Sequence, residues 1–131
     1  MKYFILTNNP LAADEFGESH DVRFIEGVFG DVLIEARNLI DKGAVLLVHP
    51  LYGSVKPNET PYRSYLLKPC EKYNAAGCAE PDPESLRLIE NAITAFNKFP
   101  DRKKVTNPSL LQDFQTVDLS LLKTAVQAAD R

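Results

Sequence analysis

Three short segments in the first half of the chain have the hydrophobic pattern of β-strands. Residues 2–7 and 44–48 are nearly continuous apolar runs, which is typical of strands buried on both faces. Residues 21–26 alternate polar and apolar side chains, as expected of a strand with one exposed face. We therefore expect three strands here, the second less buried than the others.

Two amphipathic segments separate these strands. A short helix is predicted from Pro10 to Phe16, with Asn9 as its N-cap. A second helix is predicted from a cap at Asp31 to about Lys42, and Gly43 is expected to end it in the left-handed conformation. The order strand–helix–strand–helix–strand, with short connections, predicts parallel βαβ units.

The second half adds one strand and several helices. Residues 62–68 have the pattern of a fourth strand, expected at the sheet edge. No helix precedes it, so it can run antiparallel beside the third strand, and its direction stays open. A helix is predicted over residues 83–98, and a short helix followed by a longer terminal one is predicted from Pro108.

These elements predict an α/β fold, a three-layer α/β sandwich with a mostly parallel sheet of about four strands. At 131 residues the chain is expected to form one domain. We expect its core at 1–98 and a C-terminal helical extension at 108–129.

The connection after the third strand is long, and residues 49–64 contain three prolines that restrict its backbone. Ligands of open parallel sheets bind outside the carboxyl ends of the strands. Because Thr7-Asn8-Asn9, Glu26-Gly27 and residues 49–61 leave such ends, we predict that they converge on a binding site. The alternative is that the two asparagines only shape a turn and cap a helix, while Glu26 ends a solvated strand.

The 49–64 segment contains the main candidates for chemistry. His49 is the candidate general acid–base, since an imidazole titrates near neutral pH; the alternative is a histidine packed under the loop and bonded to backbone. Gly53, Ser54 and Lys56 offer an amide, a hydroxyl and a cation that suit a carboxylate or a phosphate.

The end of the same segment is rich in polar side chains. Asn58, Glu59 and Thr60 are predicted either to contact a ligand or to hold the loop together. Arg63 is predicted to pair with an anionic ligand or with Glu59.

Composition and spacing exclude several classes of protein. The net charge of −3 gives no basic surface for nucleic acid, and no apolar run is long enough for a membrane span. The first apolar run is too short for a secretory signal, so a cytoplasmic location is expected. Cys70 and Cys78 do not have zinc or redox spacing and are interpreted as ordinary thiols in a loop.

No metal or cofactor is expected either. The turn after the first strand lacks the glycines of a dinucleotide-binding motif, and the 49–64 segment lacks the spacing of a P-loop. No group of histidine, cysteine and carboxylate residues has metal-ligand spacing.

Two motifs together resemble one known family. The pairing of TNNP at 7–10 with HPLYGSVKPNETPYRS at 49–64 is similar to the GrdX family, whose members are small proteins encoded beside the glycine, sarcosine and betaine reductase systems of anaerobic bacteria that ferment amino acids. The resemblance covers residues 1 to about 98 and includes Glu26-Gly27. It implies a cytoplasmic accessory role near these reductases and supplies no reaction.

Three functional hypotheses follow. The first is an accessory protein that binds a small anionic ligand or a segment of a partner, such as a protein of the reductase system, at 49–64. The second is a small enzyme in which His49 acts as general acid–base and Ser54, Lys56 and Arg63 fix an anionic substrate. The third is an assembly module without a small-molecule ligand. If the chain forms an oligomer, a homodimer is the commonest arrangement.

Overall fold

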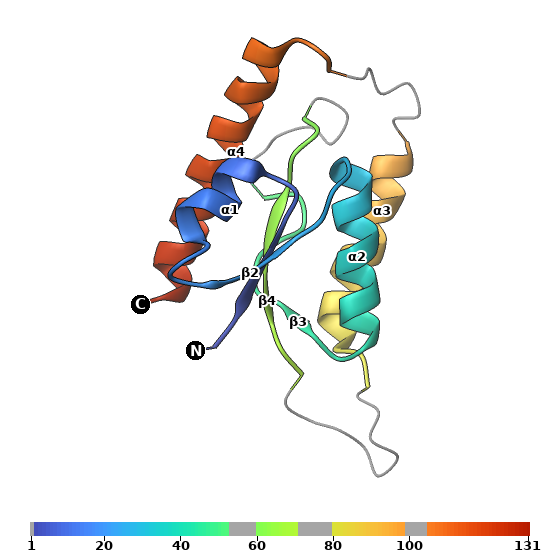
Figure 1. Ribbon diagram of the computed structural model, residues 1–131. Helices are drawn as coiled ribbons and strands as arrows, with labels where there is room; N and C mark the ends of the chain where they lie inside the picture. Colours follow the sequence, from blue (N-terminus) through green and yellow to red (C-terminus); the bar gives the residue numbers. More distant parts are fainter. Residues whose placement is uncertain (1, 53–59, 71–79, 99–104) are drawn as a thin grey trace.

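The structure is a computed structural model that describes residues 2–52, 60–70, 80–98 and 105–131. Its strands form one sheet in the order β2-β1-β4-β3 (Figure 1). Their bounds are β1 (Phe4–Thr7), β2 (Asp21–Phe24), β3 (Val45–Leu46) and β4 (Ser64–Lys68). β1 pairs in parallel with β2, whereas β4 runs antiparallel to both β1 and β3. The prediction of a mostly parallel sheet is therefore wrong.

The prediction of the fourth strand at the sheet edge is also wrong: β4 takes an interior position, and the strand beside it, β3, lies at the edge. The four residues from Ser64 to Leu67 are all buried, whereas β3 is only two residues long. The longer, fully buried strand is the one that can be covered on both faces. Because β1 and β3 are both antiparallel to β4, the strands β1, β2 and β3 share one direction and their carboxyl ends lie along one rim of the sheet.

Helices cover both faces of this sheet. α1 (Pro10–Phe16) and α4 (Pro108–Ala129) lie on one side, and α2 (Phe29–Asp41) and α3 (Pro83–Asn97) lie on the other (Figure 1). Successive residues of β1 alternate between the two cores: Phe4 and Leu6 pack with α2 and α3, whereas Ile5 packs with α1 and α4. The inner strands β1 and β4 are thus buried on both faces, whereas the edge strand β2 is largely exposed.

The N-cap predicted for α1 is confirmed, and the N-cap predicted for α2 is corrected. Asn9 caps α1, accepting a hydrogen bond from the Leu11 amide at 3.0 Å. α2 begins earlier than predicted, and its N-cap is Val28, so the prediction of Asp31 as the cap is wrong. Asp31 is the third helical residue, and its carboxylate accepts from the Val28 amide at 2.7 Å. Gly43 has φ of 101°, the left-handed conformation predicted for it.

The two C-terminal helices predicted from the sequence are one continuous helix, α4. Residues 109–129 contain no proline or glycine, so nothing in the backbone interrupts the hydrogen-bond ladder. The C-terminal half of α4 buries Leu122 and Val126 against α1 and the sheet. Its N-terminal half extends past α1 at the top of Figure 1. Across the described ranges, every helix falls short of what a membrane span requires.

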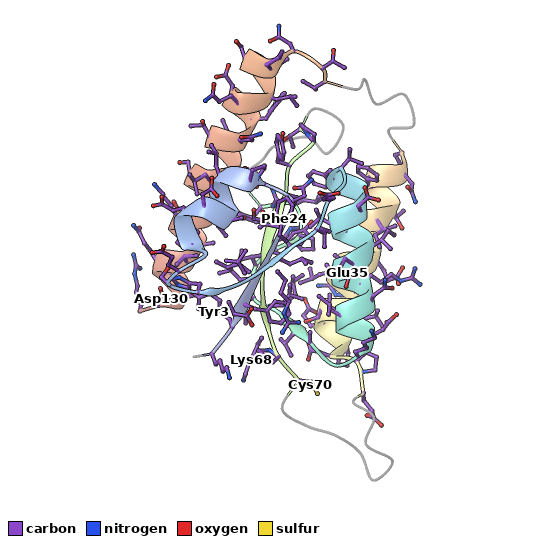
Figure 2. The ribbon with its side chains drawn as sticks, viewed as in Figure 1. Tyr3, Phe24, Glu35, Lys68, Cys70 and Asp130 are labelled. Atoms are coloured by element: carbon purple, nitrogen blue, oxygen red, sulfur yellow. The ribbon has the colours of Figure 1, made fainter. Side chains whose placement is uncertain are left out.

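The C-terminal end of α4 is held beside the start of β1. The Tyr3 hydroxyl donates to Asp130 Oδ1 at 2.6 Å, and His20 Nε2 lies 3.5 Å from Asp130 Oδ2. Tyr3 and Asp130 lie next to each other in Figure 2. These contacts fix one end of the helix, and the candidate site lies against its middle.

Candidate functional site

Three chain segments meet at the rim of the sheet through the side chain of Asn8. Its Nδ2 donates to the carbonyls of Gly27 at 2.9 Å and Pro61 at 2.8 Å, and its Oδ1 accepts from the Arg63 amide at 2.9 Å. The three strand-end segments are thus brought together as the topology indicates. Asn8 is only 3% exposed and uses its polar atoms for these internal bonds, so in this structure it positions the rim.

A second chain of hydrogen bonds runs from the rim to α4. The Asn9 amide donates to Thr7 Oγ1 at 3.0 Å, and Thr7 Oγ1 lies 2.7 Å from Ser64 Oγ. Ser64 Oγ donates in turn to Asp118 Oδ2 at 2.7 Å. Because the single proton of Ser64 is used on Asp118, Ser64 accepts from Thr7. Polar side chains of β1, β4 and α4 thus form one continuous buried chain.

Asp118 is the residue that the sequence interpretation missed. Its Oδ2 also accepts from Asn9 Nδ2 at 2.9 Å, but its Oδ1 has no hydrogen-bond partner among the described residues. Burial raises the pKa of this carboxyl, opposed by the hydrogen bonds from Asn9 and Ser64 and by the charge of Arg63. Its spacing was the available signal, since Asp118 lies four residues from both Phe114 and Leu122 on the apolar stripe of the helix.

Arg63 is a buried cation on the opposite face of the sheet. The side chain is 1% exposed, and its guanidinium carbon lies 3.9 Å from the centre of the Tyr52 ring. One terminal nitrogen donates to the Tyr52 carbonyl at 2.8 Å, while Nε has no partner within the described part of the chain. The rings of Tyr65 and Phe29 lie 5.5 and 5.8 Å from the same carbon. This aromatic setting stabilises a charge that lacks a directly bonded carboxylate among these residues.

A pocket of about 160 Å³ opens between the rim and α4, and we call it the α4 pocket. It is lined on the rim side and on the helix side by Thr60, Tyr62, Arg63, Phe114, Val117, Asp118 and Leu121. Its helix wall is mainly apolar, and the one carboxylate in the wall is Asp118. Val117 is 48% exposed and lies where the pocket meets the surface. The helix side of the pocket thus contains one carboxylate, whose Oδ1 is buried and has no hydrogen-bond partner among the described residues.

The remaining predicted site residues are placed differently. His49 is exposed, and its Nδ1 accepts from the Leu51 amide at 3.1 Å, which shapes the turn. Glu26 is exposed at the rim, and Thr60 is buried with its Oγ1 accepting from the Tyr62 amide at 3.2 Å. The other predicted site residues, and one cysteine, lie outside the described residues: Gly53, Ser54, Lys56, Asn58, Glu59 and Cys78.

The described side chains around the α4 pocket are mainly apolar. Within the described ranges, no three histidine, cysteine or acidic residues are grouped as metal ligands. The α4 pocket combines an apolar surface, the aromatic rings of Tyr62 and Phe114, and one buried carboxylate. Ligand sites are commonly lined by apolar side chains with a small number of polar groups.

Comparison with protein families matches most of the chain. The family model described as GrdX-like protein matches residues 4–127. The match reaches well into α4, beyond the limit near residue 98 expected from the two motifs, and it includes every residue of the α4 pocket. No curated protein and no solved structure matches the chain.

Proposed function

The chain belongs to the GrdX-like protein family, and we propose that it is a non-catalytic, cytoplasmic accessory protein of glycine, sarcosine or betaine reductase systems. In this proposal, a ligand or a segment of a partner protein binds at the rim and enters the α4 pocket. The observation that supports it most is the pocket itself, a cavity of about 160 Å³ with an unpaired buried carboxylate in its wall. Buried polar groups without partners are rare in folded proteins and call for an explanation.

The state of His49 favours binding over catalysis. A general acid–base needs a position beside the reacting group, in a site that excludes water. His49 is exposed and does not line the α4 pocket, and one of its ring nitrogens is occupied by the Leu51 amide. The enzyme hypothesis therefore draws no support from the described contacts of this residue.

The charge of the bound group is the next question. The anionic ligand predicted from the sequence depends on Gly53, Ser54 and Lys56, which lie outside the described residues. Arg63 offers a cation, but its guanidinium is buried under the ring of Tyr52. The charge that the described residues bring to the α4 pocket from the helix is negative.

A stability screen tests this proposal. We expect one or more members of a panel of amino acids, N-methylated amino acids, amines, acyl phosphates and nucleotides, or a purified reductase component, to stabilise the protein. A ligand at 100 times its Kd adds about 2.7 kcal/mol to the free energy of unfolding. Thermal unfolding followed by fluorescence measures this effect.

Matched variants on α4 locate the binding. Val117→Trp is expected to fill the mouth of the pocket and abolish the stabilisation, because Val117 is a half-exposed residue of its wall. Leu110→Trp, at a residue 44% exposed on the same helix but outside the pocket, should leave the stabilisation intact. Equal stabilisation of the two variants would contradict the proposed location, and a panel without any effect would contradict the binding role.

A further inference from the structure

Only one of the two carboxylate oxygens of Asp118 accepts hydrogen bonds from the described residues. Both of its hydrogen bonds, from Asn9 Nδ2 and Ser64 Oγ, go to Oδ2, and Oδ1 has no partner in the described part of the chain. Asp118 is 3% exposed, so bulk water does not compensate for the missing bond. Among the described residues no lysine, arginine or histidine forms an ion pair with it. A buried carboxylate in this state is costly unless another donor completes it.

The volume of the α4 pocket indicates that the hydrogen-bond donor to Asp118 belongs to a molecule larger than water. One water has a share of about 30 Å³ of liquid volume, whereas a cavity of about 150 Å³ accommodates benzene. The α4 pocket, at about 160 Å³, therefore has room for a chain of several carbon atoms. Phe114, Val117 and Leu121 supply the apolar contacts for such a chain.

The charges around the pocket select among ligands of this size. The lining contains two charged residues, Asp118 and Arg63, and the guanidinium of Arg63 is stacked on the ring of Tyr52. An anion would meet the carboxylate of Asp118, and a purely apolar group would leave Oδ1 without a partner. A cation carrying N–H groups satisfies the oxygen and the charge together. Tyr62 and Phe114, in the same lining, carry aromatic rings, the type of side chain whose face attracts a cation.

We infer that the α4 pocket binds a primary alkylammonium group, which donates to Asp118 Oδ1 while its alkyl chain lies against the apolar wall of α4. This inference rests on the proposed binding role of the pocket and adds the class of its ligand. The group can belong to a free amine or to a lysine side chain of a partner, and both present the same chemistry.

Titrations with three probes of equal length test the inference. Butylammonium, butyrate and 1-butanol are added in turn to the ¹⁵N-labelled full chain, and amide chemical shifts give the affinities. Butylammonium is expected to shift the amides of residues 114–121, with affinity at least about tenfold above that of the other two probes, as a charge-assisted hydrogen bond implies. Equal binding of butanol or butyrate would overturn the inference.

Two isosteric substitutions on α4 distinguish binding at Asp118 from a general effect of negative charge on the helix. Asp118→Asn is expected to weaken butylammonium binding at least about tenfold, whereas Asp113→Asn, which removes an exposed carboxylate from the same helix, leaves it unchanged. Should Asp118→Asn fail to fold, Val117→Trp provides the second test, since blocking the pocket must also abolish binding. Unaltered binding in the folded Asp118→Asn or Val117→Trp variant would refute the site.

Further arms identify the source of the amine and separate the two proposals. If Nα-acetyl-lysine N-methylamide binds with the affinity of butylammonium, the ligand is assigned to a lysine side chain of a partner. If this larger probe is too bulky to bind, the ligand is assigned to a free amine. Either result supports the site. If butylammonium does not bind while another compound stabilises the protein and Val117→Trp abolishes that effect, the ammonium inference is wrong and the binding role stands. If neither is seen, both are wrong.

Discussion

Replacement of Asn8 by alanine should destabilise the rim more than any single exposed change. The substitution removes three hydrogen bonds and leaves the carbonyls of Gly27 and Pro61 and the amide of Arg63 without their partner. The site is 3% exposed, so water does not readily replace the lost side chain. At about 1 kcal/mol for each net hydrogen bond, the expected loss is about 3 kcal/mol of unfolding free energy. For a domain of this size the loss corresponds to roughly 10 °C in Tm.

Urea denaturation of the wild type and the variant measures this loss directly from the shift of the transition midpoint. Asn38→Ala is the matched control, because Asn38 is exposed on α2 and alanine is the better helix former there, so stability should hold or rise slightly. A loss below about 1 kcal/mol for Asn8→Ala would refute the view that this one side chain joins the three segments.

Two further predictions concern the buried charges. Burial raises the pKa of Asp118, so the folded state binds this proton more tightly than the unfolded state. The contribution of this group to stability therefore falls as pH rises from its unfolded pKa through its folded pKa. In urea titrations, the stability of Asp118→Asn relative to wild type should increase between pH 3 and pH 7. Arg63→Ala should lower the free energy of unfolding by on the order of 3 kcal/mol, since it leaves the Tyr52 carbonyl and the charge of Asp118 without the buried guanidinium. Arg63→Lys should restore little of this stability, because an ammonium lacks the planar group that stacks on Tyr52.

Exposed residues of the same type provide the controls for these predictions. Asp113→Asn removes a carboxylate from the surface of α4 and isolates the effect of burial. Arg87 is exposed on α3 and pairs with Glu84, so Arg87→Ala should change stability little. A pH-independent difference for Asp118→Asn, or equal losses for the two arginine variants, would contradict the roles given to these charges.

The sequence predicted the elements better than their pairing. The pattern around Asn9 gave the bounds of α1, and Gly43 was found in the conformation predicted for it. Strand direction and neighbour depend on contacts between distant residues, such as Leu6 with Tyr65, which local periodicity does not contain. The missing crossover helix allowed an antiparallel β4 but left its direction open, and it carried no information about β4 lying between β1 and β3.

The convergence of the three strand-end segments was predictable, whereas the composition of the α4 pocket was not. The direction shared by β1, β2 and β3 brings their carboxyl ends to one rim, as the topology argument required. The carboxylate of the α4 pocket comes from the far end of the sequence, where Asp118 looked like a polar residue of an amphipathic helix. Asn9 Nδ2, 109 residues away in sequence, is one of the two donors that mark this aspartate as a rim residue.

The interior position of β4 has a consequence for the order in which the protein is assembled during synthesis. Thr7 and Ser64 are 57 residues apart, so the inner edge of β1 has no strand to pair with until the ribosome has released β4. At 5–20 residues per second this interval lasts several seconds. β3, which pairs only with β4 in the described sheet, is made earlier and must wait as well. We therefore expect a nascent chain that ends before Ser64 to hold the β1–β2 pair alone, and completion of the sheet to be a late, cooperative event.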